Sequence, residues 1–263
     1  MKKYNIIIMA GGENELWCQK YGYKKRAFLP LLGKPMLGWV IDAFHRSEYI
    51  DKIIVVGAEE LKGLTSMRYV YKHLYGGNSF MRNLFTAIFY LKAVIYKFSN
   101  THSGYLISFC DAAFLTTSSI DACLRNITEH DPGIGLHYVL KETLAKAGYP
   151  AENRSYMRVG GRDYTGSVIY YVKETRKLLR LFKDIILIRK YRKEPNKIFE
   201  NIAPEVSSVS GIERALSKRL ATKVKIFISP YAEIGVDVDK TSDYELAKIQ
   251  LQKAQEEYVK REF

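Results

Sequence analysis

The sequence predicts an α/β protein built on a mainly parallel β-sheet. Through the first half of the chain, short continuous apolar runs alternate with stretches of helical periodicity. Such runs are typical of strands buried on both faces, and strands separated by helices form right-handed βαβ units. Of the 263 residues, 47% are hydrophobic and 26% are charged, as in a globular protein. Disordered, collagen-like and coiled-coil proteins are excluded, and no apolar run is long enough to span a bilayer.

The first expected strand covers residues 5–9, because its apolar run is too short for a signal peptide and ends in Gly11 and Gly12. A segment at 27–32 follows a polar loop, and an amphipathic helix is expected at 36–46. Further strands are expected at 52–56, 68–72, 105–109, 137–141, 157–161, 168–172 and 223–229. Further helices are expected at 79–96, 118–128 and 240–263, with a succession of helices at 173–220. Since no repeat or low-complexity linker interrupts this order, we expect one domain over 1–263.

The charge and cysteine content indicate the setting in which the protein works. A net charge of +13 favours an anionic partner, such as a nucleotide or a phosphorylated metabolite. The three cysteines, Cys18, Cys110 and Cys123, show no metal-ligand spacing and are odd in number, so we expect a reducing cytoplasm. The five histidines are scattered, which disfavours a zinc site.

Three segments fall at the carboxyl edge of the expected sheet, where such sheets bind ligands. Ala10, Gly11 and Gly12 directly follow the first strand, and glycines there let backbone amides approach phosphate oxygens closely. A plain turn is the alternative. The turn at 76–78 and Asp111 lie at the same edge, so one cleft is expected to contain all three segments.

Acidic residues at two places are candidate Mg²⁺ ligands. A carboxylate at the tip of a buried strand, such as Asp111, can hold Mg²⁺ together with substrate phosphates; a helix-capping or loop aspartate is the alternative. Asp237 and Asp239 alternate along an extended segment, which points both carboxylates to one side. Helix capping is the alternative for Asp239, since Ser242 and Glu245 fit a capping box, but it leaves Asp237 unexplained.

Taken in order, several segments over residues 4–250 resemble the MobA-like (molybdenum cofactor guanylyltransferase-like) NTP transferase superfamily. Residues 6–12 (IIIMAGG) are similar to its opening strand and LAGG signature, and 26–37 (RAFLPLLGKPML) to its K-A-L-L-P-L-x-G-K-P-M-L segment. Residues 109–116 (FCDAAFLT) resemble its G-D-x-P-L-L-T segment, and 237–244 (DVDKTSDY) its closing D-x-D-T-P-E-D-L. Residues 164–168 (YTGSV) resemble a T-G-G-N strand start.

This resemblance implies a Rossmann-like, three-layer sheet of the GT-A-like nucleotidyltransferase type. Residues 1–130 would form the nucleotide-binding half and 131–263 the acceptor half, with a basic helical insertion at 173–220. A phosphorylated small molecule would attack the α-phosphate of a nucleoside triphosphate, with Mg²⁺ as cofactor and pyrophosphate as the leaving group. The resemblance assigns nucleotide binding to Ala10, Gly11, Gly12, Lys25, Gly77 and Asn78, acceptor binding to Gly166 and Ser167, catalysis to Arg26 and Asp111, and metal binding to Asp111, Asp237 and Asp239.

The sequence departs from the family pattern in the loop after the first strand. Leu16 stands where the family has an arginine, Glu13 and Glu15 lie where the triphosphate would approach, and Arg26 replaces a lysine. These changes favour an alternative, a catalytically weakened homologue that binds a nucleotide or sugar nucleotide as a sensor or partner subunit. A glycosyltransferase on the related sheet is a third hypothesis.

A basic segment at 173–197 contains ten basic and three acidic residues, interleaved with leucines and isoleucines. The simpler interpretation is an amphipathic helix with a solvated basic face. Docking on an anionic membrane surface or on a phosphate-bearing acceptor is the alternative. A nucleic-acid partner is disfavoured, because no recognisable RNA- or DNA-binding motif accompanies the charge.

Overall fold

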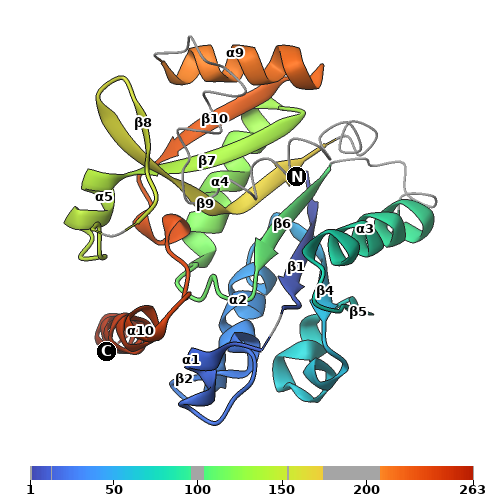
Figure 1. The fold of residues 1–263 in the computed structure, drawn as a ribbon, viewed down its shortest axis with the longest axis vertical. Helices are drawn as coiled ribbons and strands as arrows, with labels where there is room; N and C mark the ends of the chain where they lie inside the picture. The colour runs from blue at the N-terminus through green and yellow to red at the C-terminus, as the bar shows by residue number, and fades with distance from the viewer. Residues whose placement is uncertain (1, 13, 96–103, 153, 174–207, 263) are drawn as a thin grey trace.

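An eight-stranded sheet forms the centre of the protein (Figure 1). The computed structural model describes residues 2–262 apart from 13, 96–103, 153 and 174–207. The strand order is β10-β7-β9-β6-β1-β4-β5, and β8 pairs with β9. The strands are β1 (Tyr4–Ala10), β4 (Ile50–Gly57), β5 (Lys72–Tyr75), β6 (Tyr105–Phe109), β7 (Ile134–Leu140), β8 (Met157–Val159), β9 (Arg162–Val172) and β10 (Val224–Ser229).

The sheet contains two parallel groups joined by one antiparallel strand. Strands β5, β4, β1 and β6 run parallel to one another, and β10 runs parallel to β7. Strand β9 lies between β6 and β7 and is antiparallel to both. All seven residues of β1 are buried, as expected for a central strand covered on both faces. The predicted mainly parallel α/β architecture is therefore confirmed, and one sheet takes strands from both halves of the chain.

Helices cover both faces of this sheet. The helices are α1 (Leu16–Gln19), α2 (Met36–His45), α3 (Phe80–Tyr90), α4 (Thr117–His130), α5 (Lys141–Lys146), α9 (Val209–Leu220) and α10 (Thr241–Glu262). Figure 1 shows α2 and α4 on one side and α3 and α9 on the other. Successive side chains of β1 point to opposite faces of the sheet. Ile6 and Ile8 pack in the core with α2 and α4, and Ile7 and Met9 pack with α3 and α9.

Most element boundaries agree with the sequence-based expectations, and the differences have local causes. The strand expected at 68–72 is wrong: Thr65–Tyr69 forms a 3₁₀ turn and the strand begins at Lys72. Met67 and Tyr69 pack against the core from this turn, so apolar residues that suggested a strand are buried without one. The helix expected at 79–96 ends at Tyr90 and continues as a single π-helical stretch, Leu91–Ile95. Helix α5 lies where no helix was expected.

The basic segment falls mostly outside the described residues. Its first residue, Lys173, forms an ion pair with Asp131 at 2.5 Å between Nζ and Oδ2. Residues 174–207 are not described, so the amphipathic basic helix expected at 173–197, its alternative as a membrane-docking surface, and most of the helical insertion at 173–220 lie outside the described residues. Helix α9 supplies the last turns of that insertion. Nowhere in the described part of the chain is a helix both long and apolar enough to cross a bilayer.

Candidate active site

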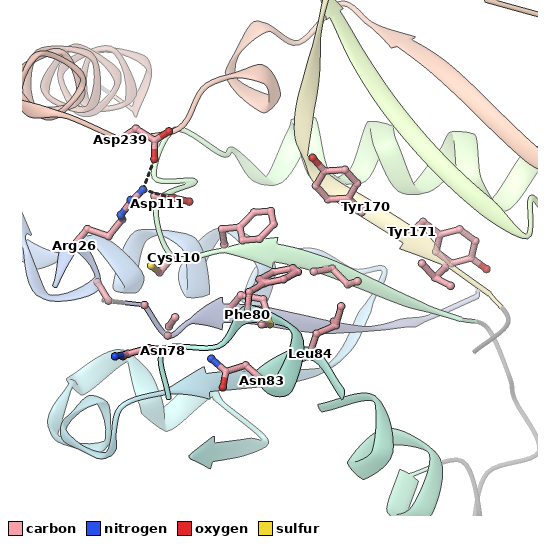
Figure 2. A pocket seen from close by; sticks show the side chains of 18 of the residues that line it. Arg26, Asn78, Phe80, Asn83, Leu84, Cys110, Asp111, Tyr170, Tyr171 and Asp239 are labelled. Carbon is pink, nitrogen blue, oxygen red and sulfur yellow. Dashed lines mark hydrogen bonds and ion pairs between the residues drawn. The ribbon is translucent and has the colours of Figure 1, made fainter. Parts of the chain in front are cut away.

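A cavity of about 810 Å³ opens at the carboxyl ends of β1 and β6. Its size falls within the range of pockets that bury small-molecule ligands. Figure 2 shows Arg26, Asp111 and Asp239 grouped on one side of it, with Asn78 and Asn83 across from them. Of the residues expected to form the site, the cavity is lined by Ala10, Gly11, Gly12, Lys25, Arg26, Asn78, Asp111 and Asp239. The predicted convergence of the glycine loop, the 76–78 turn and Asp111 in one cleft is therefore observed.

The glycine loop after β1 lies tightly against the turn that follows β5. A Cβ added to Gly11 would stand 2.4 Å from Nδ2 of Asn83 and 2.9 Å from the carbonyl oxygen of Gly77. No side chain fits there without moving these atoms, so glycine is required by close approach of the two backbones. Loops of this kind bring amides near an anionic ligand.

Asn83, at the first turns of α3, holds the turn at Gly77 by two hydrogen bonds. The backbone N–H of Gly77 donates to Oδ1 of Asn83 at 3.0 Å, and Nδ2 of Asn83 donates to the carbonyl oxygen of Gly77 at 2.8 Å. Asn83 is 3% exposed, so both bonds are shielded from water. Ser79 caps the helix by accepting from the backbone N–H of Arg82. The amide of Asn83 thus fixes both backbone groups of one loop residue.

Asp111 lies two residues after Phe109, the last residue of β6, and its backbone holds the carboxy-terminal acidic segment. The backbone N–H of Cys110 still donates to Met9, which carries the parallel pairing past the end of β6. The backbone N–H of Val238 then donates to the carbonyl oxygen of Asp111 at 3.0 Å. This bond brings residues 237–239 beside Asp111, although they are far away in the sequence.

Arg26 lies at the centre of a group of acids. Its Nη1 donates to Oδ2 of Asp111 at 2.5 Å and also to Asp239. Its Nε donates to Oε1 of Glu15 at 2.6 Å, and the other oxygen of Glu15 accepts from Nε1 of Trp17 at 2.7 Å. One guanidinium therefore binds three carboxylates from three separate parts of the chain, which uses the fork of donors that a lysine lacks.

Asp237 is directed to a second arginine. Its Oδ1 accepts from Nη2 of Arg154 at 3.0 Å, and the same nitrogen donates to the carbonyl oxygen of Gly235 at 2.9 Å. The carboxylate of Asp239 accepts from Arg26, and its backbone N–H donates to the side chain of Asp243 in α10, so these bonds do not support Asp239 as the helix cap. Glu245 does not cap: it accepts from Tyr21 and pairs with Lys248.

The acidic cluster keeps an excess of negative charge. Burial raises the pKa of Asp111, Arg26 opposes this rise, and the charges of Asp237 and Asp239 add to it. Burial also raises the pKa of Asp237, with Asp239 adding to the rise and Arg154 opposing it. The carboxylates of the cluster are Glu15, Asp111, Asp237 and Asp239, and the guanidinium groups that bind them are Arg26 and Arg154. With all four carboxylates ionised, this described cluster would carry a formal excess of two negative charges, and the raised pKa values of Asp111 and Asp237 make that excess smaller near neutral pH.

This donor set fits a divalent cation. Among the described residues, no three His, Cys, Asp or Glu side chains form a complete metal cage. Mg²⁺ does not need one, because it is commonly held by one or two carboxylates and completes its shell with water and substrate phosphates. Asp111 and Asp239 both line the cavity, and the acidic character of the cluster around them favours a bound cation.

Two expected acceptor residues do not face the cavity. Gly166 pairs with Tyr138 in the sheet, and neither it nor Ser167 is among the cavity-lining residues. Ser167 is 4% exposed, and its hydroxyl donates to the carbonyl oxygen of Ile169. Gly77 contributes through its contact with Asn83 and is likewise outside the lining. The roles assigned to these three residues stay predictions.

Reasoning from the sequence missed Asn83, Arg154 and the binding of Glu15 to Arg26. In the sequence, Asn83 is an ordinary residue of an amphipathic helix, and only its place six residues after a Gly-Gly pair could have drawn attention to it. Arg154 lies in an irregular segment with no periodic signal. Glu13, the other acid of the departing loop, is outside the described residues. Leu16 is 81% exposed and does not line the cavity.

Comparisons with known proteins agree with this architecture. A family model described as the MobA-like NTP transferase domain matches residues 6–138, just over half of the chain. A 2-C-methyl-D-erythritol 4-phosphate cytidylyltransferase from Clostridium acetobutylicum is 39% identical over 67 residues. That match covers 26% of this chain and only 28% of the relative.

Solved structures share the fold over nearly the whole chain. A hypothetical transferase from Thermus thermophilus is 24% identical, with a TM-score of 0.71, over 93% of this chain and 100% of that one. A 4-diphosphocytidyl-2C-methyl-D-erythritol synthase from Anaerococcus prevotii is 14% identical, with a TM-score of 0.55, over 95% and 96% of the two chains. The Rossmann-like, GT-A-like sheet expected from the sequence is the fold of these proteins as well.

Proposed function

This chain belongs to the MobA-like NTP transferase family, and we propose that it transfers a nucleoside monophosphate from a nucleoside triphosphate to a phosphorylated small molecule. The observation that carries the proposal is the meeting of the glycine loop, Arg26 and Asp111 at one end of a cavity. The similarity to a cytidylyltransferase covers one quarter of the chain and is consistent with the same reaction class.

The glycine loop and the turn at Asn78 would bind the nucleotide. Gly11 and Gly12 offer backbone amides to phosphate oxygens, and Asn78 lines the opposite wall of the cavity. Lys25 lines the same end and supplies a further positive charge. Arg26 holds a fixed positive charge beside Asp111, where phosphate oxygens of the triphosphate would lie.

In the reaction, an oxygen of the acceptor phosphate forms a bond to the α-phosphorus. The bond between the α-phosphorus and the oxygen that bridges it to the β-phosphate breaks, and pyrophosphate leaves with that electron pair. The attacking phosphate is already an anion, so no general base is needed. The work of the protein is to align the reactants and to neutralise charge. Mg²⁺, held by Asp111 and Asp239 together with phosphate oxygens, would supply positive charge that offsets the charge developing at the α-phosphate.

The test measures nucleotide binding and pyrophosphate release. We expect a nucleoside triphosphate to raise the melting temperature more strongly with Mg²⁺ than without it, and Asp111→Ala to abolish pyrophosphate release. Asp51→Asn, at an exposed aspartate on β4 far from the cavity, is the matched control and should behave like wild type. Full pyrophosphate release by Asp111→Ala would remove the metal assignment.

One observation favours a second candidate, a homologue that binds nucleotide without turnover. Arg26 is bound by Glu15 in addition to Asp111 and Asp239, which restricts its movement. Leu16, at the place of the family's arginine, exposes its side chain to solvent. A binding protein would need the cavity but not an arginine free to move onto the triphosphate. Calorimetric binding of a nucleoside triphosphate, with no pyrophosphate formed from any phosphorylated acceptor, would decide for this candidate.

A further inference from the structure

Beyond Asp111 the cavity continues into an apolar part, which we call the apolar chamber. It lies over β6, β9 and β7, between α3 and α9, and its walls include Leu84, Phe109, Leu136, Tyr170, Leu216 and Leu220. Figure 2 shows this division: Arg26, Asp111 and Asp239 lie at one side, and Phe80, Leu84, Tyr170 and Tyr171 extend away from them. The chamber and the acidic cluster are therefore two ends of one space.

The described walls of the chamber offer few partners for polar groups. Among the described residues that line the cavity past Asp111, Arg219 is the charged one, at the far end on α9. Phe109 and Tyr170 stand ring edge to ring face at a centroid distance of 6.1 Å. Tyr170 is 37% exposed, so its ring is a wall that a ligand can reach. A ligand here would meet aromatic and aliphatic surface along most of its length.

We propose that the acceptor is a phosphate monoester with an apolar body, of the alkyl phosphate type. This inference rests on the proposed function, in which the acceptor phosphate attacks the α-phosphorus of a triphosphate bound beside Asp111 and Arg26. From that point the rest of the acceptor has to run along Phe109 and Tyr170 into the chamber. A polyol phosphate would place its hydroxyls against the mainly apolar side chains that the structure describes here, which disfavours it, whereas each methylene of an alkyl chain contributes favourably to the free energy of binding by leaving water. The acceptor phosphate bonds to the α-phosphorus and pyrophosphate leaves, as above.

The experiment compares n-alkyl phosphates of increasing length with glycerol 3-phosphate, using the full chain, Mg²⁺ and each common nucleoside triphosphate. We expect kcat/KM for pyrophosphate release to rise about fourfold for each added methylene until the chamber is filled, and to stay low with glycerol 3-phosphate. Binding of the same alkyl phosphates is followed in parallel by thermal shift, which needs no turnover. We expect the same dependence on chain length there.

Variants of Leu216 place the effect in the chamber. Leu216→Trp fills space and should shorten the chain length that binds best, and Leu216→Gln should flatten the dependence on length. Lys218→Gln, at an exposed residue of the same helix, is the control and should leave the profile unchanged. A loss of folding would lower kcat/KM and binding for all acceptors alike, and it would not change the chain length that binds best.

Two failures are distinguishable. Binding that does not depend on chain length, or a preference for glycerol 3-phosphate, overturns the inference while the nucleotidyltransferase proposal stands. Binding that rises with chain length but no pyrophosphate from any acceptor counts against the proposed transfer reaction and leaves the apolar ligand class supported. A length profile unmoved by Leu216→Trp in a folded variant also overturns the inference.

Discussion

The Nη1 of Arg26 lies 2.5 Å from Oδ2 of Asp111, although 85 residues separate them in the chain. The pair joins the segment that precedes α2 to the end of β6. Because the same guanidinium also binds Glu15 and Asp239, it is the point at which four segments of the site are held together. The guanidinium of Arg26 therefore holds these segments together without any ligand.

Replacing Arg26 by Met should leave three carboxylates facing one another without their counter-charge. We expect the free energy of unfolding at pH 8 to fall by about 2 kcal/mol, less than for a fully buried pair because the side chains are partly solvated. Mg²⁺ should recover more stability in this variant than in wild type, since the acids are then free to bind it. Urea denaturation with and without Mg²⁺ measures both effects.

Arg162→Met provides the control for that experiment, because Arg162 is exposed at the start of β9, outside the cavity. It should change neither stability nor the response to Mg²⁺. Arg26→Lys keeps the charge but not the fork of donors, so we expect intermediate stability. If Arg26→Met were as stable as wild type without Mg²⁺, the guanidinium would not hold the acids together.

Gly11→Ala tests whether the two loops must touch. The new Cβ would stand 2.4 Å from Nδ2 of Asn83, so the loop or the asparagine has to move. We expect a loss of stability of about 1–3 kcal/mol and weaker nucleoside triphosphate binding, both seen by thermal shift. Gly63→Ala is the control, because a Cβ at Gly63 meets no atom within 4 Å. Unchanged binding by Gly11→Ala would show that close approach of the loops is not needed.

Asn83→Ala removes both hydrogen bonds to Gly77. Because Gly77 then loses its fixed position, we expect KM for the nucleoside triphosphate to rise by about tenfold with kcat little changed, which corresponds to the loss of one or two hydrogen bonds. Steady-state kinetics of pyrophosphate release give the two constants separately. Thr86→Ala, one turn further along α3, removes a methyl group and a hydroxyl that donates to the carbonyl oxygen of Arg82, and it should leave both constants unchanged. A fall in kcat alone would contradict a positioning role.

The fold was largely predictable because its main signal is local. Each buried parallel strand is a short apolar run, and β6 has the predicted bounds. The meeting of Gly11 with Asp111 follows from strand direction alone, since carboxyl ends of parallel strands share an edge. Residue patterns do not carry strand direction, however, so the antiparallel placement of β9 could not be read from its sequence.

The missed features of the site depend on contacts between distant segments. The bond of Glu15 to Arg26 crosses a loop whose course no periodicity describes. In the sequence, Glu15 is a negative charge where phosphate would approach and thus counts against catalysis. In the structure, the Glu15 carboxylate accepts hydrogen bonds from Arg26 and from Trp17. Tertiary pairing decides whether a charge in such a loop repels a ligand or orders the residue that binds it.

The last prediction concerns stability in acid and the buried residue His137. This side chain lies on β7, is 2% exposed and stacks on Phe227 with ring centroids 5.0 Å apart. Burial lowers the pKa of His137 from 6.5 to about 4. Between these pH values the unfolded chain binds a proton that the folded protein excludes, so the free energy of unfolding should fall by up to about 3 kcal/mol as the pH drops from 7 to 4. His137→Phe should remove that part of the pH dependence in urea denaturation, whereas His45→Phe, at an exposed histidine stacked on Tyr69, should not. Equal acid sensitivity of wild type and His137→Phe would mean that other groups, such as the carboxylates paired with lysines and arginines, account for it.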